Sequence, residues 1–164
     1  MKRFELRHAF PFPRDAVWAE VFGDAYQKAS GVDDKVNREV LEEREVAGDV
    51  RRRIRITHKD PMPSFIQRWT GPHLRYIIVQ RGRVGETAFD WHIEPAALPD
   101  KIQVKGRYEL VDAPGGCERV VKAEIRVTIF GVGGKIEKGI ADDLRKSYED
   151  SATFAQRWLQ ERLA

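Results

Sequence analysis

The sequence predicts an α+β domain in which one strongly bent antiparallel sheet grips a single long helix. Three observations indicate this fold class. Strand-like segments dominate the middle of the chain, and the clearest of them alternate apolar and polar residues without exception. Such alternation is typical of an antiparallel sheet that is covered on one face only. The end of the chain instead repeats apolar residues at three- and four-residue spacing, as a covering helix does.

The N-terminal part predicts a strand followed by two short helices. In KRFELRHAF, residues 2–10, one face holds Phe4, Leu6, His8 and Phe10. Pro13 suits the first turn of a helix, and Gly23 ends the apolar stripe of that helix. A second short helix is expected near residues 25–30. Helices this short are not stable alone, so we expect both to pack on other elements.

About six strands are expected next. Residues 35–45 and 49–59 flank the turn VAGDV and predict a hairpin. Residues 61–72 hold three prolines and a glycine, so we expect a loop with one helical turn there. The remaining strands are expected at residues 74–81, 87–95, 101–110 and 120–130, the last two joined by the connection DAPGGCE.

The terminal helix is expected over residues 135–163 and would be roughly 40 Å long at about 1.5 Å per residue. A helix of that length would cross the entire curved sheet. Its apolar stripe consists of Ile136, Ile140, Leu144, Tyr148, Ser151, Ala155, Trp158 and Leu159. Gly131, Gly133 and Gly134 precede the helix, and two interpretations of them stay open. They allow a sharp turn from the last strand, or they leave backbone N–H groups free for an anionic head group.

The middle of the helical stripe is not bulky, and neither is the sheet face expected opposite. Ser147, Ser151 and Ala155 on the helix would face Gly106 and Ala123 on the strands. Small residues against small residues leave space, which indicates a cavity for an apolar or amphipathic ligand. They also permit a close approach of helix and sheet, and the sequence does not decide between the two.

One strand has two possible registers. If Phe89, Trp91 and Ile93 face the core, Asp90 and His92 face solvent, and a slip by one residue would reverse this. Three apolar residues against two polar ones favour the first register.

Size and composition limit the class of protein. The 164 residues suit one domain spanning residues 1–164, and 41% apolar with 34% charged residues is typical of a soluble globular protein. No run of about eighteen apolar residues occurs, and charges interrupt the N-terminus where a signal peptide would be apolar, so a cytoplasmic location is expected. Cys117 is alone, which excludes an intrachain disulfide and a cysteine-based metal site.

Charge is unevenly distributed along the chain. Between residues 35 and 83, twelve Lys or Arg oppose six Asp or Glu, whereas residues 85–131 hold six basic and eight acidic residues. The basic half would suit an acidic partner or peripheral contact with an anionic membrane. A solvated sheet face is the simpler explanation.

The segment DVRRRIRITHK concentrates basic residues. Arg51, Arg53 and Arg55 share one strand face, and Arg52 breaks the opposite, apolar face. Aromatic residues are not interleaved with the arginines, so no nucleic-acid partner is expected. We expect cross-strand ion pairs with acidic residues of the preceding strand, namely Glu42, Glu43 and Glu45.

The histidines lack metal-ligand spacing. His8, His58, His73 and His92 are isolated in the sequence, and no His-x-x-x-His pair occurs. We therefore expect no metal and no other cofactor. His8 and His58 fall on inward strand faces, where a histidine more often has a structural role than a functional one. No Ser-His-Asp arrangement can be assembled, so a serine nucleophile is not expected.

Two long segments resemble a known family. FELRHAFPFPRDAVWAEVFGDAYQKA at the start and VTIFGVGGKIEKGIADDLRKSYEDSATFAQRWL at the end are similar to the bacterial domain of unknown function 2505. The run from Gly133 to Glu137 is the most specific part, and MPSFIQRWTG matches more loosely. The opening also resembles, more weakly, the mitochondrial PRELI-type phospholipid carriers.

The resemblance covers nearly the whole chain and implies the START/Bet v 1-like (SRPBCC) helix-grip fold, which polyketide cyclases and lipid-transfer proteins share. It implies a hydrophobic pocket between the sheet and the long helix. The family has no established reaction, so the resemblance carries over no catalytic residue.

The function predicted from these observations is the binding or transport of a hydrophobic or amphipathic small molecule, with lipids among the candidates and without chemistry of its own. The expected lining of the cavity consists of Tyr76, Trp91, Val104, Tyr108, Ile125, Leu144, Tyr148 and Ser151. The hydroxyl groups of Tyr76 and Tyr108 are expected to point at the ligand.

Two other functions stay open. One is an enzyme like the polyketide cyclases or dehydratases that uses a tyrosine or histidine in the pocket as acid and base. The other is a protein-interaction module, like the helix-grip co-chaperones, that acts through the basic sheet face.

Overall fold

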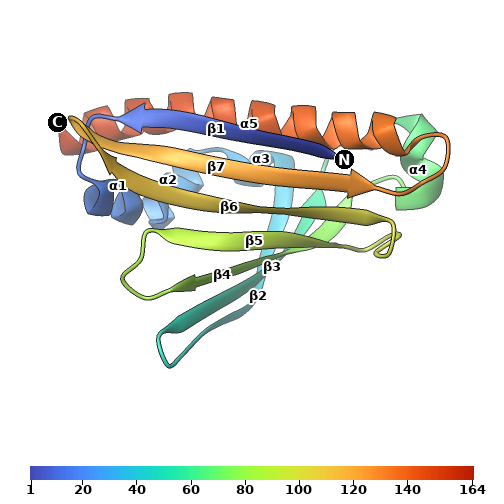
Figure 1. Ribbon diagram of the computed structural model, residues 1–164, viewed down its shortest axis with the longest axis horizontal. Coiled ribbons are helices and arrows are strands. Elements are labelled where there is room, and N and C mark those ends of the chain that lie inside the picture. The colour runs from blue at the N-terminus through green and yellow to red at the C-terminus, as the bar shows by residue number, and fades with distance from the viewer.

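The computed structural model describes residues 1–164, except for the side chain of Asp33. Within these described residues, a seven-stranded sheet is accompanied by short helices and one long helix (Figure 1). The elements are β1 (Lys2–Phe10), α1 (Arg14–Val21), α2 (Asp24–Ala29), α3 (Val32–Lys35), β2 (Val36–Val46), β3 (Asp49–His58), α4 (Ser64–Thr70), β4 (Arg75–Arg83), β5 (Ala88–Pro95), β6 (Ile102–Ala113), β7 (Gly116–Val127) and α5 (Gly133–Leu163). This order confirms the predicted fold class.

The sheet is antiparallel, with the strand order β1-β7-β6-β5-β4-β3-β2. From β2 to β7, strands that follow one another in sequence are neighbours in the sheet. β1 pairs with the last strand, β7. Phe4 of β1 lies opposite Ala123 of β7, which lies opposite Gly106 of β6. Because side chains alternate across a strand, these residues and their i+2 neighbours share one side of the sheet. We call this side, which faces α5, the inner face.

The strand with two possible registers adopts the one that the sequence favours. Trp91 lies opposite Gly106 on the inner face and is buried. Asp90 is exposed on the outer face, where it forms an ion pair with Arg107 at 3.1 Å. An interior pair of Asp90 and His92 is therefore not formed.

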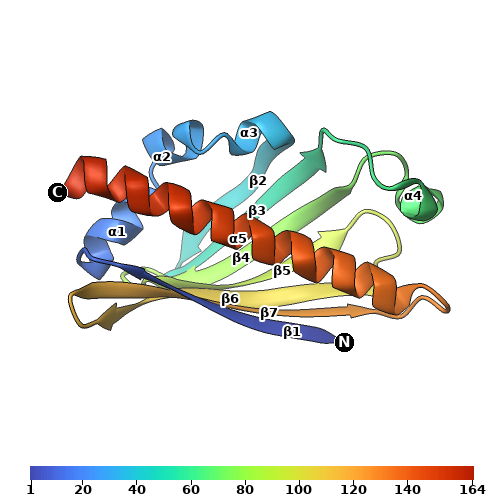
Figure 2. The same ribbon diagram turned by 90° about the horizontal axis from the view of Figure 1, so that it is seen from above.

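The long helix α5 runs over the inner side of the sheet, and in Figure 2 it passes diagonally above β5, β4 and β3. It lies closest to β1 and β7, along the edge of the sheet that these strands form (Figure 2). The sheet curls away from the helix on the other side, so β2 and β3 extend beyond it (Figure 1). The inner face is thus only partly covered by α5.

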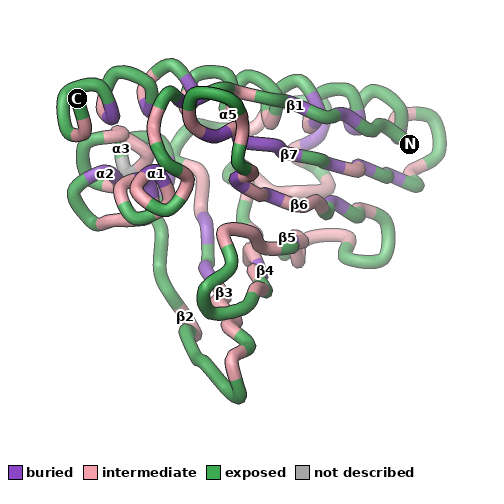
Figure 3. The backbone as a smooth tube through the Cα atoms, turned by 60° about the vertical axis from the view of Figure 1, so that its left-hand side comes forward, coloured by how far each residue is buried: buried purple, intermediate pink, exposed green. Residues whose placement is uncertain are grey.

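The buried apolar residues form two clusters. The large cluster lies beneath α5 and includes most of the buried positions along β1, β7 and β6 in Figure 3. The small cluster consists of Val36, Ile54 and Ile56 with partly buried Val32, Tyr76 and Ile78. Ile78 of β4 lies directly opposite Ile93 of β5, which packs against the large cluster. Both isoleucines are only half-buried, so some apolar surface stays accessible to solvent where the clusters meet.

Glycine is required where β7 turns into α5. Gly131 has a φ of +83°, in the left-handed region that favours glycine. A side chain on Gly133 would place its Cβ 2.5 Å from the carbonyl oxygen of Val127, closer than atoms pack. The backbone N–H of Gly133 donates to the carbonyl of Ile129 at 2.8 Å. A sharp turn therefore accounts for Gly131 and Gly133, and an anionic head group at this helix end stays a prediction.

Candidate ligand-binding site

The predicted lining residues come from both walls of the interior. The strands contribute Tyr76, Trp91, Val104, Tyr108 and Ile125, and α5 contributes Leu144, Tyr148 and Ser151. Those that are buried are Trp91, Val104, Tyr108 and Ile125, and those that are half-buried are Tyr76, Leu144, Tyr148 and Ser151. Tyr76 packs against the small cluster, whereas Trp91 and Tyr108 belong to the large one. The half-buried group retains surface that a ligand can contact without rearrangement of the protein.

The small residues expected to leave a cavity do not all do so. The indole ring of Trp91 packs against Gly106, whose missing Cβ would lie 2.6 Å from Cζ2 of that ring. The space beside Gly106 is therefore filled. Ser147 is exposed and Ala155 is buried in the large cluster. The surface that remains open lies instead at the half-buried side chains.

All four tyrosines of the sequence are desolvated. Burial raises the pKa of Tyr76 and of Tyr108 to about 12, and it also raises the pKa of Tyr26 and Tyr148. After burial, the nearby Tyr108 is the next largest cause that raises the pKa of Tyr148. These hydroxyl groups stay protonated at neutral pH, and those that do not already donate to a protein group can donate hydrogen bonds to a ligand.

His58 and Tyr76 form a polar pair at the small cluster. His58 Nε2 lies 3.0 Å from the Tyr76 hydroxyl. Burial lowers the pKa of His58, which favours the neutral imidazole. A neutral imidazole nitrogen can accept a hydrogen bond from the tyrosine hydroxyl.

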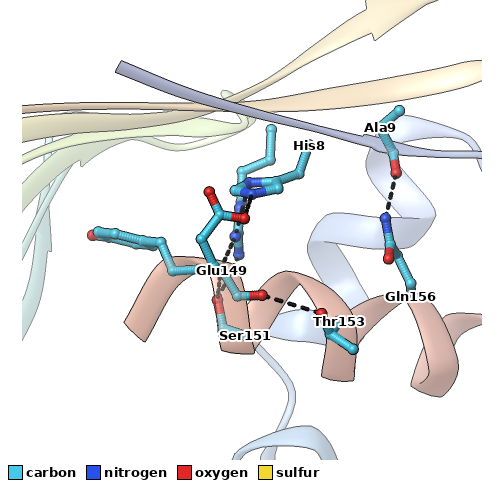
Figure 4. A network of polar contacts seen from close by, with 8 residues as sticks. His8, Ala9, Glu149, Ser151, Thr153 and Gln156 are labelled. Atoms are coloured by element: carbon cyan, nitrogen blue, oxygen red, sulfur yellow. Dashed lines mark hydrogen bonds and ion pairs between the residues drawn. The ribbon is translucent and has the colours of Figure 1, made fainter. Parts of the chain in front are cut away.

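Arg119 of β7 lies buried beneath α5, with only 4% of its surface exposed. Its Nη1 donates to Ser151 Oγ at 3.0 Å, and its Nη2 donates to the Tyr148 carbonyl at 2.7 Å and to His8 Nδ1 at 3.2 Å. His8 Nε2 in turn lies 2.9 Å from Glu149 Oε2 (Figure 4). Arg119 Nε is buried and has no hydrogen-bond partner among the described residues.

The Arg119 network defines the protonation of His8. An arginine can only donate hydrogen bonds, so His8 Nδ1 must be the acceptor and carries no proton. The ring proton is then on Nε2, which donates to Glu149, and His8 is neutral. Figure 4 shows His8 from β1 and Glu149 from α5 pointing toward each other. The Glu149 side chain is 54% exposed, so the network runs from the solvent to the interior.

Arg119 was not among the predicted residues, although the strand pattern contains a signal for it. The apolar residues of β7 alternate from Val121 onward, and the same face holds Arg119 two residues before Val121. A charged residue in phase with an apolar stripe is the signal that singled out Arg52. Arg52 does lie on the inner face, where it forms an ion pair with Glu43 at 3.4 Å.

The two ends of the interior differ. At one end aromatic side chains pack together, because Phe22 lies 5.5 Å and Phe89 lies 5.1 Å from the ring of Tyr108. At the other end, where α4 lies beside the start of α5 in Figure 1, aromatic side chains face solvent. Phe130 is fully exposed, and Phe65 is 41% exposed with Lys135 Nζ 4.0 Å from its ring centroid.

The outer face of the sheet carries an open groove of about 830 Å³ across β1, β7, β6, β5 and β4, with Phe4, Trp91 and Ala123 at its apolar base. Charged side chains line it, and they pair with one another, as Arg3 does with Glu124 at 3.2 Å. A groove with such walls suits a hydrophobic ligand less well than the inner face does. Among the described residues, no three His, Cys, Asp or Glu side chains come together as a metal ion would require. In the same part of the chain, no helix has both the length and the apolar composition for crossing a bilayer.

A bent antiparallel sheet that holds one long helix over its inner face is the helix-grip fold, which START and Bet v 1-like proteins share. The family model described as "Protein of unknown function (DUF2505)" matches residues 5–159, so the chain belongs to this family. A comparison with curated protein sequences found no match.

Solved structures with the same fold have little sequence in common with this chain. A Thermus thermophilus protein is 15% identical, with a TM-score of 0.68 over 99% of this chain and 100% of that one. The ZhuI aromatase/cyclase from a Streptomyces species is 12% identical, with a TM-score of 0.67 over 99% and 96% of the two chains. A START superfamily protein from Mycobacterium smegmatis is 10% identical, with a TM-score of 0.59 over 96% and 97%. At these identities the likeness shows the fold alone.

Proposed function

We propose that this protein binds a hydrophobic or amphipathic small molecule between the inner face of its sheet and α5. The observation that carries the proposal is the presence of two separate apolar clusters with half-buried side chains where they meet. A ligand there would remove apolar surface from water, at about 25 cal/mol per Å². The proposed contacts are the predicted lining residues Tyr76, Trp91, Val104, Tyr108, Ile125, Leu144, Tyr148 and Ser151.

Native mass spectrometry of the protein purified without detergent tests this proposal. We expect either a ligand that is carried through purification or binding of added compounds from a panel of fatty acids, phospholipids and polycyclic aromatics. A panel in which no compound binds would contradict the proposal.

A bulky residue at the junction of the clusters should block the site. We expect Ile78→Trp to lower the affinity for any compound that the panel identifies by about tenfold or more, because the indole would occupy the ligand's place. Ile77→Trp is the matched control, because Ile77 is the next residue on β4 and points to the outer face. Titration of both variants with the identified compound measures the effect, and equal affinities would locate the ligand elsewhere.

If the ligand is a lipid, the α4 end of the molecule is the proposed point of peripheral contact with an anionic membrane. Phe130 and Phe65 would enter the interface while Lys135 meets the head groups. Phe130→Ser should weaken sedimentation with anionic vesicles, whereas Val84→Ser, an exposed apolar residue between β4 and β5, should not. Equal binding by both variants would contradict this contact.

The pair of His58 and Tyr76 favours an enzyme as the second candidate function. A neutral imidazole in contact with a tyrosine hydroxyl can act as base and acid in a cyclisation or dehydration. Turnover of a poly-ketone or hydroxy-acyl substrate, lost in His58→Gln, would support it. If such substrates bind but none is converted, the enzyme function is contradicted and the binding function remains.

A further inference from the structure

The charge of Arg119 lacks a direct counter-charge. None of the described carboxylates forms an ion pair with it, and the nearest one in its network, Glu149, is separated from it by the neutral ring of His8. Removing a charged group from water is costly unless an opposite charge or a full set of hydrogen bonds replaces the solvent. The hydrogen bonds of Arg119 are incomplete, because its Nε–H has no acceptor.

Apart from the neutral hydroxyl group of Tyr108, which lies close to the guanidinium, the polar groups around Arg119 offer few free acceptors. Ser151 Oγ accepts from Arg119 and already donates to the Tyr148 carbonyl. Farther along the inner face, where Trp91 lies opposite Gly106, the Trp91 Nε1–H is also buried and has no acceptor among the described residues. A partner that completes this interior must therefore bring acceptor oxygens and negative charge.

The aromatic rings around Arg119 indicate the chemistry of the remaining part of the ligand. The guanidinium carbon lies 5.6 Å from the Tyr148 ring and 5.9 Å from the rings of Tyr108 and Phe10. Tyr108 also stacks on Phe89 at 5.1 Å, which leads toward half-buried apolar positions of the inner face. A molecule that reaches Arg119 must have an apolar part that fits among these rings.

We propose that Arg119 binds the carboxylate of an amphipathic acid whose apolar part lies along the inner face. This inference rests on the proposed function and specifies the class of ligand. One buried guanidinium matches one negative charge, which favours a monoanionic carboxylate. His8 and Ser151 act as positioning residues, because they hold the guanidinium without contacting the ligand's apolar part.

A competition between an acid and its uncharged analogue tests the inference. Palmitate and hexadecanol have the same chain length, and each is titrated against a fluorescent fatty-acid probe bound to the protein. We expect palmitate to bind at least about tenfold more tightly, as charge-assisted hydrogen bonds do. In Arg119→Met, which keeps the apolar stem of the side chain, that preference should disappear while hexadecanol still binds.

Glu149→Gln provides a second variant at a partly exposed position, where a failure to fold is not expected. Loss of this negative charge should strengthen palmitate binding by about two- to fivefold, as for one charge acting through partly solvated surroundings. Binding of hexadecanol should not change. Asp150→Asn is the matched control, because Asp150 is the next residue of α5 and pairs with Lys146 at 2.7 Å outside the network.

Equal affinity of the wild-type protein for palmitate and hexadecanol would overturn the role of Arg119 and leave the proposed function intact. An unchanged preference for the acid in Arg119→Met would overturn it in the same way. Absence of binding by both compounds would overturn this ligand class, and only failure of the complete panel would also contradict the proposed function.

Discussion

Several polar side chains of the interior are buried, and for tyrosine this burial makes the stability of the fold depend on pH. The hydroxyl groups of Tyr76 and Tyr108 keep their protons to a pKa of about 12, whereas tyrosines of the unfolded chain lose theirs near 10. The folded state therefore binds more protons than the unfolded state between these pH values. The resulting contribution to stability is complete below about pH 10 and is lost as the pH rises toward about 12.

We expect the free energy of unfolding to fall between about pH 10 and pH 12, and to fall less in Tyr108→Phe. Denaturant unfolding at a series of pH values measures this slope. The ultraviolet absorbance of tyrosinate gives an independent measurement on the folded protein. Titration of all tyrosines near pH 10 without unfolding would contradict the burial of these hydroxyl groups.

At the level of single elements, the outer strands show what local patterns leave undetermined. The register between β2 and β3 shifts between Val40 and Glu42, and no residue of β2 marks this irregularity in the sequence. Of the three acidic residues expected to form cross-strand ion pairs, Glu43 does so, with Arg52 at 3.4 Å. Glu42 instead pairs with Arg44 on its own strand at 3.2 Å. Because these groups are mostly exposed, each pair contributes about 0–1 kcal/mol.

The turn between β7 and α5 gives a prediction for glycine. We expect Gly133→Ala to lower the free energy of unfolding by about 1–3 kcal/mol, because the new Cβ would collide with the Val127 carbonyl. Gly139→Ala in the same helix should raise it by about 0.5–1 kcal/mol, because its Cβ would meet no atom within 4 Å. Denaturant unfolding of both variants measures the difference. Changes of the same sign at both positions would contradict this account of the turn.

For the whole molecule, the sequence predicts the element order and the inner face well, because both follow from local periodicity. Trp91 and Tyr108 face inward as their alternation requires. The course of α5 along β1 and β7 depends on the curvature of the complete sheet, which no short segment encodes. The Arg119 network also escapes prediction, because β1, β7 and α5 each contribute one member or more.

A ligand bound in the interior should stabilise the whole fold. Binding to the folded state alone adds about 2.7 kcal/mol to the free energy of unfolding at a ligand concentration of 100 Kd. We expect this increase for the wild-type protein with its ligand and a smaller one for Ile78→Trp at the same concentration. Thermal or denaturant unfolding with and without ligand measures it. No increase under saturating conditions would mean that the ligand binds the unfolded chain equally well.

The pairing of β1 with β7 has a consequence for how the polypeptide is made. Lys2 lies opposite Ile125, so the first strand to leave the ribosome finds its neighbour only after more than a hundred further residues have been synthesised. Until then neither edge of β1 has a strand partner, and the apolar side chains that α5 covers face solvent or a chaperone. The pairing of β1 with β7 therefore forms late, and α5, which follows β7 in the chain, covers the inner face last.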